Sequence, residues 1–381
     1  MKNRSYYILF TSLFCLASCG EPTSASFTLN DLGNNVTIHT RIQNEYFVNK
    51  TFEDISTDIY YAKEEKLPRK TDLSAPEAVK IAWSITTDKG SLSSYKVNVS
   101  ENSDLSDSYI INTNTTEALF YNAKINTKYY YQVSSGQFKS DIGMFSTDNK
   151  GPRNIYVDGV RNIRDLGGYG FMKQGMLYRG GSFESIDEKT KALTINITDL
   201  GRKTITDQLG IKTEVDLRKN KADSSGIVEN CNLTKSTIDG LSYISLPMYY
   251  GGKNILEYSD DDYDDPARVK DFFELLANEN NYPMYFHCTH GKDRTGGLAY
   301  VLQALFGADK ESMYRDYLFS NFASYMDYNM NVDGIEGKFG KTLSNYTQGQ
   351  TLQEKTYFFL INEINVSGDT LDRVIDILKV N

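Results

Sequence analysis

A cysteine, an arginine and a threonine, residue types suited to phosphoryl transfer, lie close together late in the chain. They occur in the run Cys288-Thr289-His290-Gly291-Lys292-Asp293-Arg294-Thr295-Gly296. A tight loop that leads into a helix turns several backbone N–H groups inward and adds the positive end of the helix dipole, which favours a tetrahedral dianion. The same field favours a thiolate at Cys288, and the planar fork of Arg294 matches two phosphate oxygens. We expect Thr295 to hydrogen-bond the sulfur and Gly291 to permit a backbone geometry that a side chain would block. The run therefore predicts a phosphate-binding loop with Cys288 as nucleophile.

Strands alternating with helices have to hold this loop in place. His287 ends a short apolar run, 284–287, and the apolar spacing after the loop predicts a helix that ends at Gly307. Other strands are predicted at 212–217 and 243–246. This alternation predicts an α/β domain with a central, mostly parallel sheet flanked by helices.

Two further helices are predicted from apolar residues at i, i+3, i+4 and i+7 spacing. The first has its apolar stripe at 269–276, with Pro266 at its first position and Asp265 as its cap. The second has its stripe at 371–378, close to the C-terminus.

The loop carries the signature of the cysteine-dependent protein tyrosine phosphatase superfamily. It resembles in particular a bacterial group whose loop reads His-Cys-x-x-Gly-Lys-Asp-Arg-Thr-Gly, and residues 162–168 (Asn-Ile-Arg-Asp-Leu-Gly-Gly) are similar to the entry motif of that group. Three more segments fall in the family's order: Leu177-Tyr178-Arg179, Val215-Asp216-Leu217-Arg218 and Arg315-Asp316-Tyr317-Leu318. The resemblance covers residues 152–381 and implies a cysteine-phosphatase fold. His290 departs from it, because a small alanine is common at that position.

The resemblance implies a two-step reaction that needs no metal and no other cofactor. Cys288 attacks phosphorus, and water then hydrolyses the phosphocysteine. Residues Thr289 to Arg294 bind the phosphate through their amides and the guanidinium group. The sequence has no Trp-Pro-Asp loop, the usual source of the proton for the leaving oxygen, and its only tryptophan is Trp83. In the resembling group the acid is an aspartate inside the loop, which here is Asp293.

Other residues are secondary candidates for the site. Asp165 is an alternative acid, and the acidic run 260–265 is another if it forms a mobile lid. That run lacks the spacing and the glycine of a calcium loop, so no metal site is predicted there. We expect His287 to orient the loop through hydrogen bonds, and Arg164 and Arg218 to support the structure rather than to bind phosphate directly.

The sequence leaves the substrate open between two classes of phosphate ester. Phosphotyrosine in proteins, with phosphoserine and phosphothreonine as further substrates, is the leading prediction. In the family a lysine at the place of Lys292 adds positive charge beside the pocket, and some members accept phosphoinositides, so a phosphoinositide or inositol phosphate is the alternative. A non-enzymatic surface binding protein is a third possibility, against which the intact Cys288, Arg294 and Thr295 argue.

Residues 77–148 are predicted to form a separate β-sandwich. Its short strands are expected at 79–83, 95–99, 129–133 and 144–147, separated by polar turns. The strand around Trp83 and the run Thr127-x-Tyr129-x-Tyr131-x-Val133 resemble a fibronectin type III domain, in which Tyr129 would occupy the tyrosine corner. Such a module spaces or binds, and this one contains no catalytic cluster.

Residues 1–18 predict a lipoprotein signal peptide, because Lys2 and Arg4 precede an apolar run that is too short to span a bilayer. The sequence Leu16-Ala17-Ser18-Cys19 resembles the bacterial lipobox, which implies a lipid on Cys19 and attachment to a membrane. An ordinary cleaved signal is the alternative. Residues 19–76 are predicted to be a tether and an N-terminal extension. These features predict an extracytoplasmic protein of the bacterial cell envelope.

The composition narrows the remaining classes. The 381 residues are 40% hydrophobic and 24% charged, which excludes a multi-spanning membrane protein. The formal net charge of −9 argues against binding to nucleic acid, which needs basic surface. Four cysteines are too few for a disulfide scaffold of this size, and Cys231 is predicted to be a free thiol.

Overall fold

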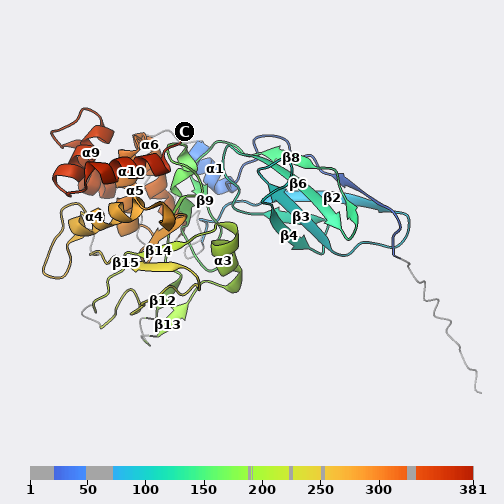
Figure 1. Ribbon diagram of the computed structural model, residues 1–381, viewed down its shortest axis with the longest axis horizontal. Coiled ribbons are helices and arrows are strands. Elements are labelled where there is room, and N and C mark those ends of the chain that lie inside the picture. The colour runs from blue at the N-terminus through green and yellow to red at the C-terminus, as the bar shows by residue number, and fades with distance from the viewer. Residues whose placement is uncertain are drawn as a thin grey trace, which may run out of the picture. The chain divides into compact units, whose positions relative to one another are not determined.

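The structure is a computed structural model, and it describes residues 21–48, 72–187, 190, 192–222, 226–249, 254–323 and 332–380. The predicted signal peptide, Cys19 and residues 49–71 of the predicted tether lie outside these ranges. The chain divides into two compact units. Among the described residues, one takes 21–31, 81–118 and 130–144, and the other takes 32–48, 72–80, 119–129 and those from 145 onward (Figure 1).

Two sheets contain the strands between residues 25 and 146, in the orders β1-β2-β5 and β4-β3-β6-β7, with β8 also paired to β6. Their bounds are β1 (Ala25–Leu29), β2 (Val79–Thr87), β3 (Tyr95–Ser100), β4 (Tyr109–Thr113), β5 (Glu117–Phe120), β6 (Lys128–Ser135), β7 (Phe138–Lys139) and β8 (Gly143–Ser146). The pairing of β1 with β2, and of β3 with both β4 and β6, is antiparallel. Three of the four predicted strands fall within β2, β3 and β6, and the fourth, 144–147, overlaps β8 and extends one residue beyond it. The fibronectin type III assignment stays a prediction.

Alternating burial explains why these sequences form strands. In β6 the residues Tyr129, Tyr131 and Val133 are buried, while the residues between them are partly exposed. The Tyr129 hydroxyl accepts a hydrogen bond from the backbone N–H of Lys124 at 2.7 Å, five residues upstream, which is the kind of contact expected of a tyrosine corner.

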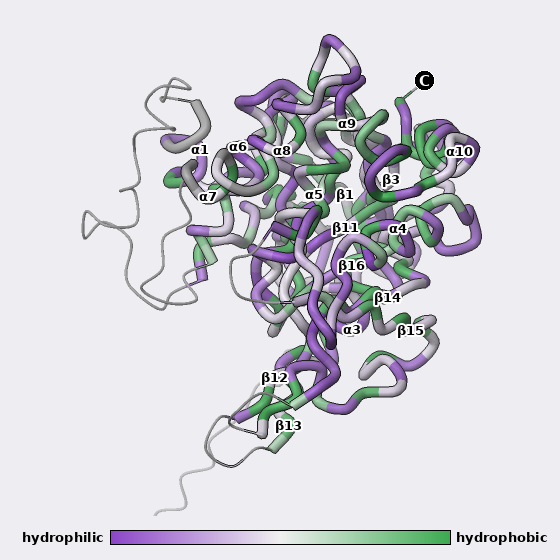
Figure 2. Tube along the Cα trace, turned by 90° about the vertical axis from the view of Figure 1, so that its left-hand side faces the viewer, coloured by the Kyte–Doolittle hydropathy of each residue, from purple (hydrophilic) through white to green (hydrophobic). Residues whose placement is uncertain are grey.

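The second unit contains a six-stranded mixed sheet in the order β15-β14-β16-β11-β10-β9. The strands β15 (Ser242–Ser245), β14 (Thr213–Asp216), β16 (Met284–His287) and β11 (Leu177–Gly180) are parallel neighbours. The short strands β10 (Arg164–Asp165) and β9 (Arg153–Asn154) are added antiparallel at one edge. Figure 2 shows β11, β16, β14 and β15 following one another in this order. The α/β prediction is therefore confirmed, with an antiparallel edge added to the parallel strands.

Both faces of this sheet are covered, as expected for parallel strands. Successive side chains of a strand point to opposite faces, so Met284 and Phe286 of β16 join one core while Tyr285 joins the other. The larger core packs against α4 (Asp265–Leu276), α5 (Arg294–Leu305), α6 (Lys310–Phe319), α9 (Leu352–Asn362) and α10 (Gly368–Leu378). The smaller core includes residues around α3 (Asp199–Lys203).

The remaining elements of this unit are short. They include α1 (Arg41–Val48), the hairpin β12 (Glu184–Ile186) and β13 (Leu193–Ile195), α7 (Val332–Ile335), α8 (Lys341–Ser344) and several single turns of 3-10 or π helix. Within the ranges that the structure describes, no helix has both the length and the apolar character needed to cross a bilayer.

The start of α4 corrects one prediction from the sequence. The cap is Asp264, whose side chain accepts a hydrogen bond from the N–H of Ala267 at 3.1 Å, and Asp265 is already helical. Pro266 therefore follows the first helical residue instead of being it. The carboxyl group of Asp265 is buried inside the protein and does not cap the helix.

Candidate active site

The predicted phosphate loop lies at the carboxyl end of β16, in the centre of the mixed sheet, and leads directly into α5. Ligand sites of open parallel sheets lie at this end of the strands. Cys288 is the first loop residue and only 3% of its surface is exposed. Arg294 begins α5 and is equally buried, so both predicted catalytic residues lie below the surface.

The carbonyl groups of the loop are held outward by donors from neighbouring segments. The carbonyl of Thr289 accepts from the N–H of Ser182 at 3.3 Å, and that of His290 accepts from Asn162 Nδ2 at 2.9 Å. The carbonyl of Gly291 accepts from Arg179 Nη2 at 2.6 Å. In a trans peptide the C=O and the following N–H point in opposite directions. The N–H groups of the next residues therefore point into the loop, where an anion would bind.

Gly291 is needed for this path of the chain. Its φ of +68° is in the left-handed region, and an added Cβ would lie 2.3 Å from the backbone of Gly180. This explains the glycine that the sequence places in the middle of the loop.

A buried group of ion pairs supports the donors. Asp316 pairs with Arg164 Nε at 2.9 Å and with Arg179, and all three side chains are at most 2% exposed. Arg164 also donates to the Oδ1 atom of Asn162. The structure thus places Arg164 of the entry motif behind the loop. There it bonds directly to Asn162 and, through Asp316, is linked to Arg179, and these two residues donate to the loop carbonyls. Asp316 links two segments that the sequence resemblance identified separately.

The surroundings of Cys288 favour its thiolate. Burial by itself would raise the pKa of the thiol, but the positive charge of Arg294 and interactions with the hydroxyl and N–H of Thr295 outweigh it, so the pKa is lowered. The Thr295 hydroxyl has no other hydrogen-bond partner within the described ranges. The position of Cys288 before the N-terminus of α5 adds to this effect.

Arg294 is oriented by a carboxylate that the sequence did not single out. Its Nη1 donates to Glu229 Oε2 at 2.6 Å and to the carbonyls of Leu217 and Met248 at 3.3 and 3.4 Å. Glu229 also accepts from the N–H of Lys219 at 3.2 Å, so its own position is fixed. No motif surrounds Glu229 in the sequence, and only the fold brings it to the loop.

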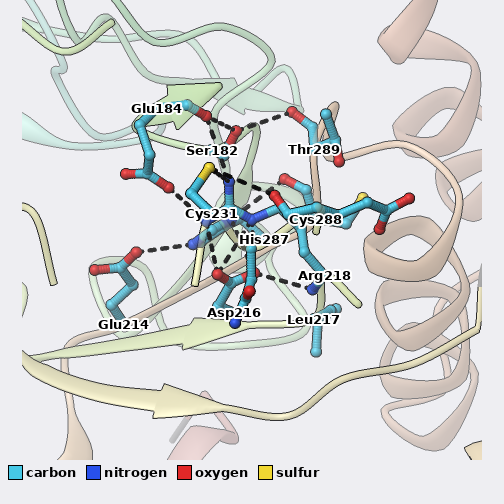
Figure 3. Close-up of polar contacts among 12 residues, drawn as sticks. Ser182, Glu184, Glu214, Asp216, Leu217, Arg218, Cys231, His287, Cys288 and Thr289 are labelled. Carbon is cyan, nitrogen blue, oxygen red and sulfur yellow. Dashed lines mark hydrogen bonds and ion pairs between the residues drawn. The ribbon is translucent and has the colours of Figure 1, made fainter. Parts of the chain in front are cut away.

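His287 lies in a second buried polar network, beneath the loop (Figure 3). Its Nε2 lies 2.9 Å from Glu214 Oε1, and its Nδ1 lies 3.2 Å from the carbonyl of Cys288. Burial alone would lower the pKa of His287, but the charge of Asp216 and the bond to Glu214 outweigh it, so the pKa is raised. This agrees with an orienting role through hydrogen bonds. Arg218 belongs to the same network, because it pairs with Asp216 at 2.7 Å.

The three candidate acids have different environments. Asp293 is half-buried, makes no capping bond to α5, and its charge acts on the Cys288 sulfur. Asp165 is 1% exposed, pairs with Arg153 at 2.6 Å and accepts two backbone N–H bonds, so its oxygens are committed to the scaffold. Asp265, at the end of the acidic run, is fully buried.

Two loop residues form the rim of the site. Lys292 and His290 are both half-buried. Burial, with the neighbouring charge of Lys292, lowers the pKa of His290 to about 4, so the extra imidazole is neutral at pH 7. Beside the loop lies a cavity of about 560 Å³, whose lining includes Thr289, His290 and Ser74. No cluster of three or more metal-ligating side chains occurs among the residues that the structure describes.

Comparisons with known proteins identify the family of the chain. The sequence pattern of the tyrosine phosphatase family matches residues 155–379, more than half of the chain. No curated protein matches the chain. Among solved structures, the core catalytic domain of the PP-IP phosphatase Siw14 from S. cerevisiae is 14% identical, with 54% of this chain and 91% of that chain covered and a TM-score of 0.28. A putative phosphatase from Shewanella putrefaciens CN-32 is 13% identical, covers 46% and 92%, and has a TM-score of 0.25.

Asp265 gives the unit a titratable group near neutral pH. Its Oδ1 accepts from the N–H of Tyr249 at 2.7 Å, and its buried Oδ2 has no hydrogen-bond partner within the described part of the chain. Burial raises the pKa of Asp265 to about 7, against the opposing effects of the Tyr249 bond and the charge of Arg294. The folded pKa thus lies above the value of about 3.9 in an unfolded chain.

This shift predicts a pH-dependent stability that Asp265→Asn removes. Because the folded pKa is the higher one, the contribution of Asp265 to the free energy of unfolding falls as pH rises from about 4 to 7, by at most about 4 kcal/mol. Asparagine keeps an oxygen for Tyr249 and does not ionise, so the variant should lose less stability between pH 5 and pH 8. Urea unfolding followed by far-UV circular dichroism measures this, since the only tryptophan, Trp83, lies in the other unit.

The matched control is Asp264→Asn, at the neighbouring exposed position, which should behave as the parent protein does. If Asp265→Asn shows the same change between the two pH values as the parent, the buried carboxyl group does not titrate in this range.

Proposed function

From the fact that this chain belongs to the tyrosine phosphatase family, and is thus a phosphoric monoester hydrolase of the cysteine type, we propose that it hydrolyses phosphotyrosine in proteins. The observation that carries the proposal is the burial of the nucleophile. Cys288 and Arg294 are each 3% exposed, so an ester has to be long enough to bring its phosphorus below the surface. The ring of phosphotyrosine provides this length more readily than the shorter phosphoserine, which favours phosphotyrosine as the main substrate.

The reaction begins with attack by the Cys288 thiolate. An S–P bond forms and the bond from phosphorus to the tyrosine oxygen breaks, while the inward N–H groups and Arg294 hold the three equatorial oxygens. Asp293, half-buried at the rim, donates a proton to the leaving phenolate. A water molecule then attacks phosphorus and gives a proton back to Asp293. The S–P bond breaks, and Thr295 stabilises the departing thiolate through its hydroxyl group.

Replacement of the nucleophile tests the mechanism. Cys288→Ser should lower kcat for a phosphotyrosine peptide by more than about 10⁴-fold, because a serine hydroxyl is not ionised in this site. The measurement is phosphate release in the presence of a chelator. Cys231→Ser is the matched control and should retain activity, since burial raises the pKa of Cys231 to about 11 and keeps it a thiol.

Two results would contradict this proposal in different ways. Activity that survives in Cys288→Ser would refute the covalent mechanism. A higher kcat/KM for a phosphoinositide than for phosphotyrosine peptides would leave the mechanism intact and replace the substrate.

The proton donor is tested with leaving groups of different basicity. Asp293→Asn should lower kcat by about 10²-fold for phosphotyrosine, and by less for p-nitrophenyl phosphate, whose leaving group needs no proton. The thiol pKa of Cys288, measured by its rate of alkylation, should fall in the variant, because the charge of Asp293 raises that pKa. An equal loss for both substrates would show that Asp293 is not the acid.

We also propose that Cys19 carries a lipid that holds the protein on the outer side of a bacterial membrane, with the fibronectin-like strands as a spacer. The support is the sequence Leu16-Ala17-Ser18-Cys19 at the end of an apolar run. Cys19→Ser should move the protein expressed in bacteria from the membrane fraction to the soluble fraction, and the neighbouring Cys15→Ser should not. Retention of Cys19→Ser in the membrane fraction would refute the anchor.

A further inference from the structure

A short segment outside the region matched by the family lies near the catalytic loop and lines the same cavity. Residues 72–75 precede the match, which begins at residue 155, yet they belong to the same compact unit. The N–H of Leu73 donates to the carbonyl of Phe322 at 2.8 Å. Gln43 Nε2 donates to the carbonyls of Leu73 and Ala75 at 2.7 and 2.8 Å. These bonds fix the segment to the unit on both sides of Ser74.

The hydroxyl of Ser74 both donates and accepts a hydrogen bond in this position. It donates to Asp72 Oδ1 at 2.6 Å and accepts from the backbone N–H of Asn162 at 3.0 Å. Ser74 is 2% exposed and Asn162 is fully buried, so removal of the hydroxyl takes a buried acceptor away from the Asn162 N–H.

Asn162 transmits this contact to the catalytic loop. Its φ of +63° is in the left-handed region, which asparagine tolerates better than most residues. In this conformation its Nδ2 reaches the carbonyl of His290 at 2.9 Å. That carbonyl shares a peptide group with the N–H of Gly291, which points toward the phosphate position.

A cavity borders the loop at this point. The cavity of about 560 Å³ is lined by the loop residues Thr289 and His290 and by Asp72, Ser74 and Ala75. Since a cavity gives its lining few van der Waals contacts, directed hydrogen bonds have to fix this part of the loop.

We propose that Ser74 is a positioning residue for phosphate binding, acting through Asn162 and the His290 carbonyl on the N–H of Gly291. Residues 72–75 of the N-terminal extension are then part of the catalytic unit. This inference rests on the proposed function for its role in turnover, but it also predicts the affinity of the loop for inorganic phosphate.

The test uses the full chain with Ser74→Ala and Ser74→Thr. Ser74→Ala leaves the Asn162 N–H without an acceptor, so the dissociation constant for orthophosphate and the inhibition constant of orthovanadate should each rise about tenfold. Ser74→Thr keeps the hydroxyl, and its methyl group has room in the cavity, so it should restore both constants to within about twofold. Calorimetry with orthophosphate measures binding even if the chain does not turn over phosphotyrosine, which separates this proposal from the proposed function.

Ser140→Ala is the matched control. Its buried hydroxyl likewise accepts a backbone N–H, that of Val133 at 3.0 Å, and donates at 2.6 Å, but it belongs to the other unit. It should lower the thermal midpoint without changing phosphate affinity. If Ser74→Ala does not fold, Gln43→Ala should loosen the same segment and weaken phosphate binding about threefold. Unchanged phosphate affinity in the folded variants, or an equal change in Ser140→Ala, would overturn the proposal.

Discussion

The geometry of the peptide group is the constraint on which the site depends. A loop presents several N–H groups to one anion only if its carbonyls point away from that anion, and each buried carbonyl then needs a donor of its own. Here the donors are Ser182, Asn162 and Arg179. A buried arginine in turn needs a carboxylate, which Asp316 supplies to both Arg164 and Arg179. The entry motif, β11 and α6 are therefore tied to the chemistry without touching the substrate.

The same scaffold supplies charge to the nucleophile. Two arginines and one aspartate leave an excess positive charge behind the loop. Burial lowers the pKa of Arg179 to about 10, as does the charge of Arg164, while Asp316 and the Cys288 thiolate oppose this change, so Arg179 stays protonated at neutral pH. Because thiolate and guanidinium stabilise each other, the residues that shape the loop also favour the reactive form of Cys288. Arg179 thus contributes both to the position of the loop and, with Arg294 and Thr295, to the reactivity of Cys288.

The parts of the site that are local in sequence could be predicted, and the parts that are distant could not. The loop, the strand ending at His287 and the helix after it are adjacent in the chain, so spacing alone reveals them. Glu229 lies 65 positions from Arg294, and Ser74 lies 88 positions from Asn162, and no motif marks either one. The sequence pattern places the cap of α4 one residue too late, at Asp265. The choice between Asp264 and Asp265 depends on which carboxylate the fold buries.

The two described cysteines show why residue type alone does not identify a nucleophile. Both are near an arginine, since Arg218 Nη1 lies 3.9 Å from the sulfur of Cys231. Burial raises the pKa of Cys231, the charges of Glu184 and Asp216 add to this rise, and Arg218 opposes it, so that the pKa is about 11. At Cys288, Arg294 and Thr295 outweigh burial and the pKa falls. The difference lies in the other groups near each sulfur. Carboxylates lie near Cys231, whereas Cys288 lies at the start of α5, beside the hydroxyl and N–H groups of Thr295.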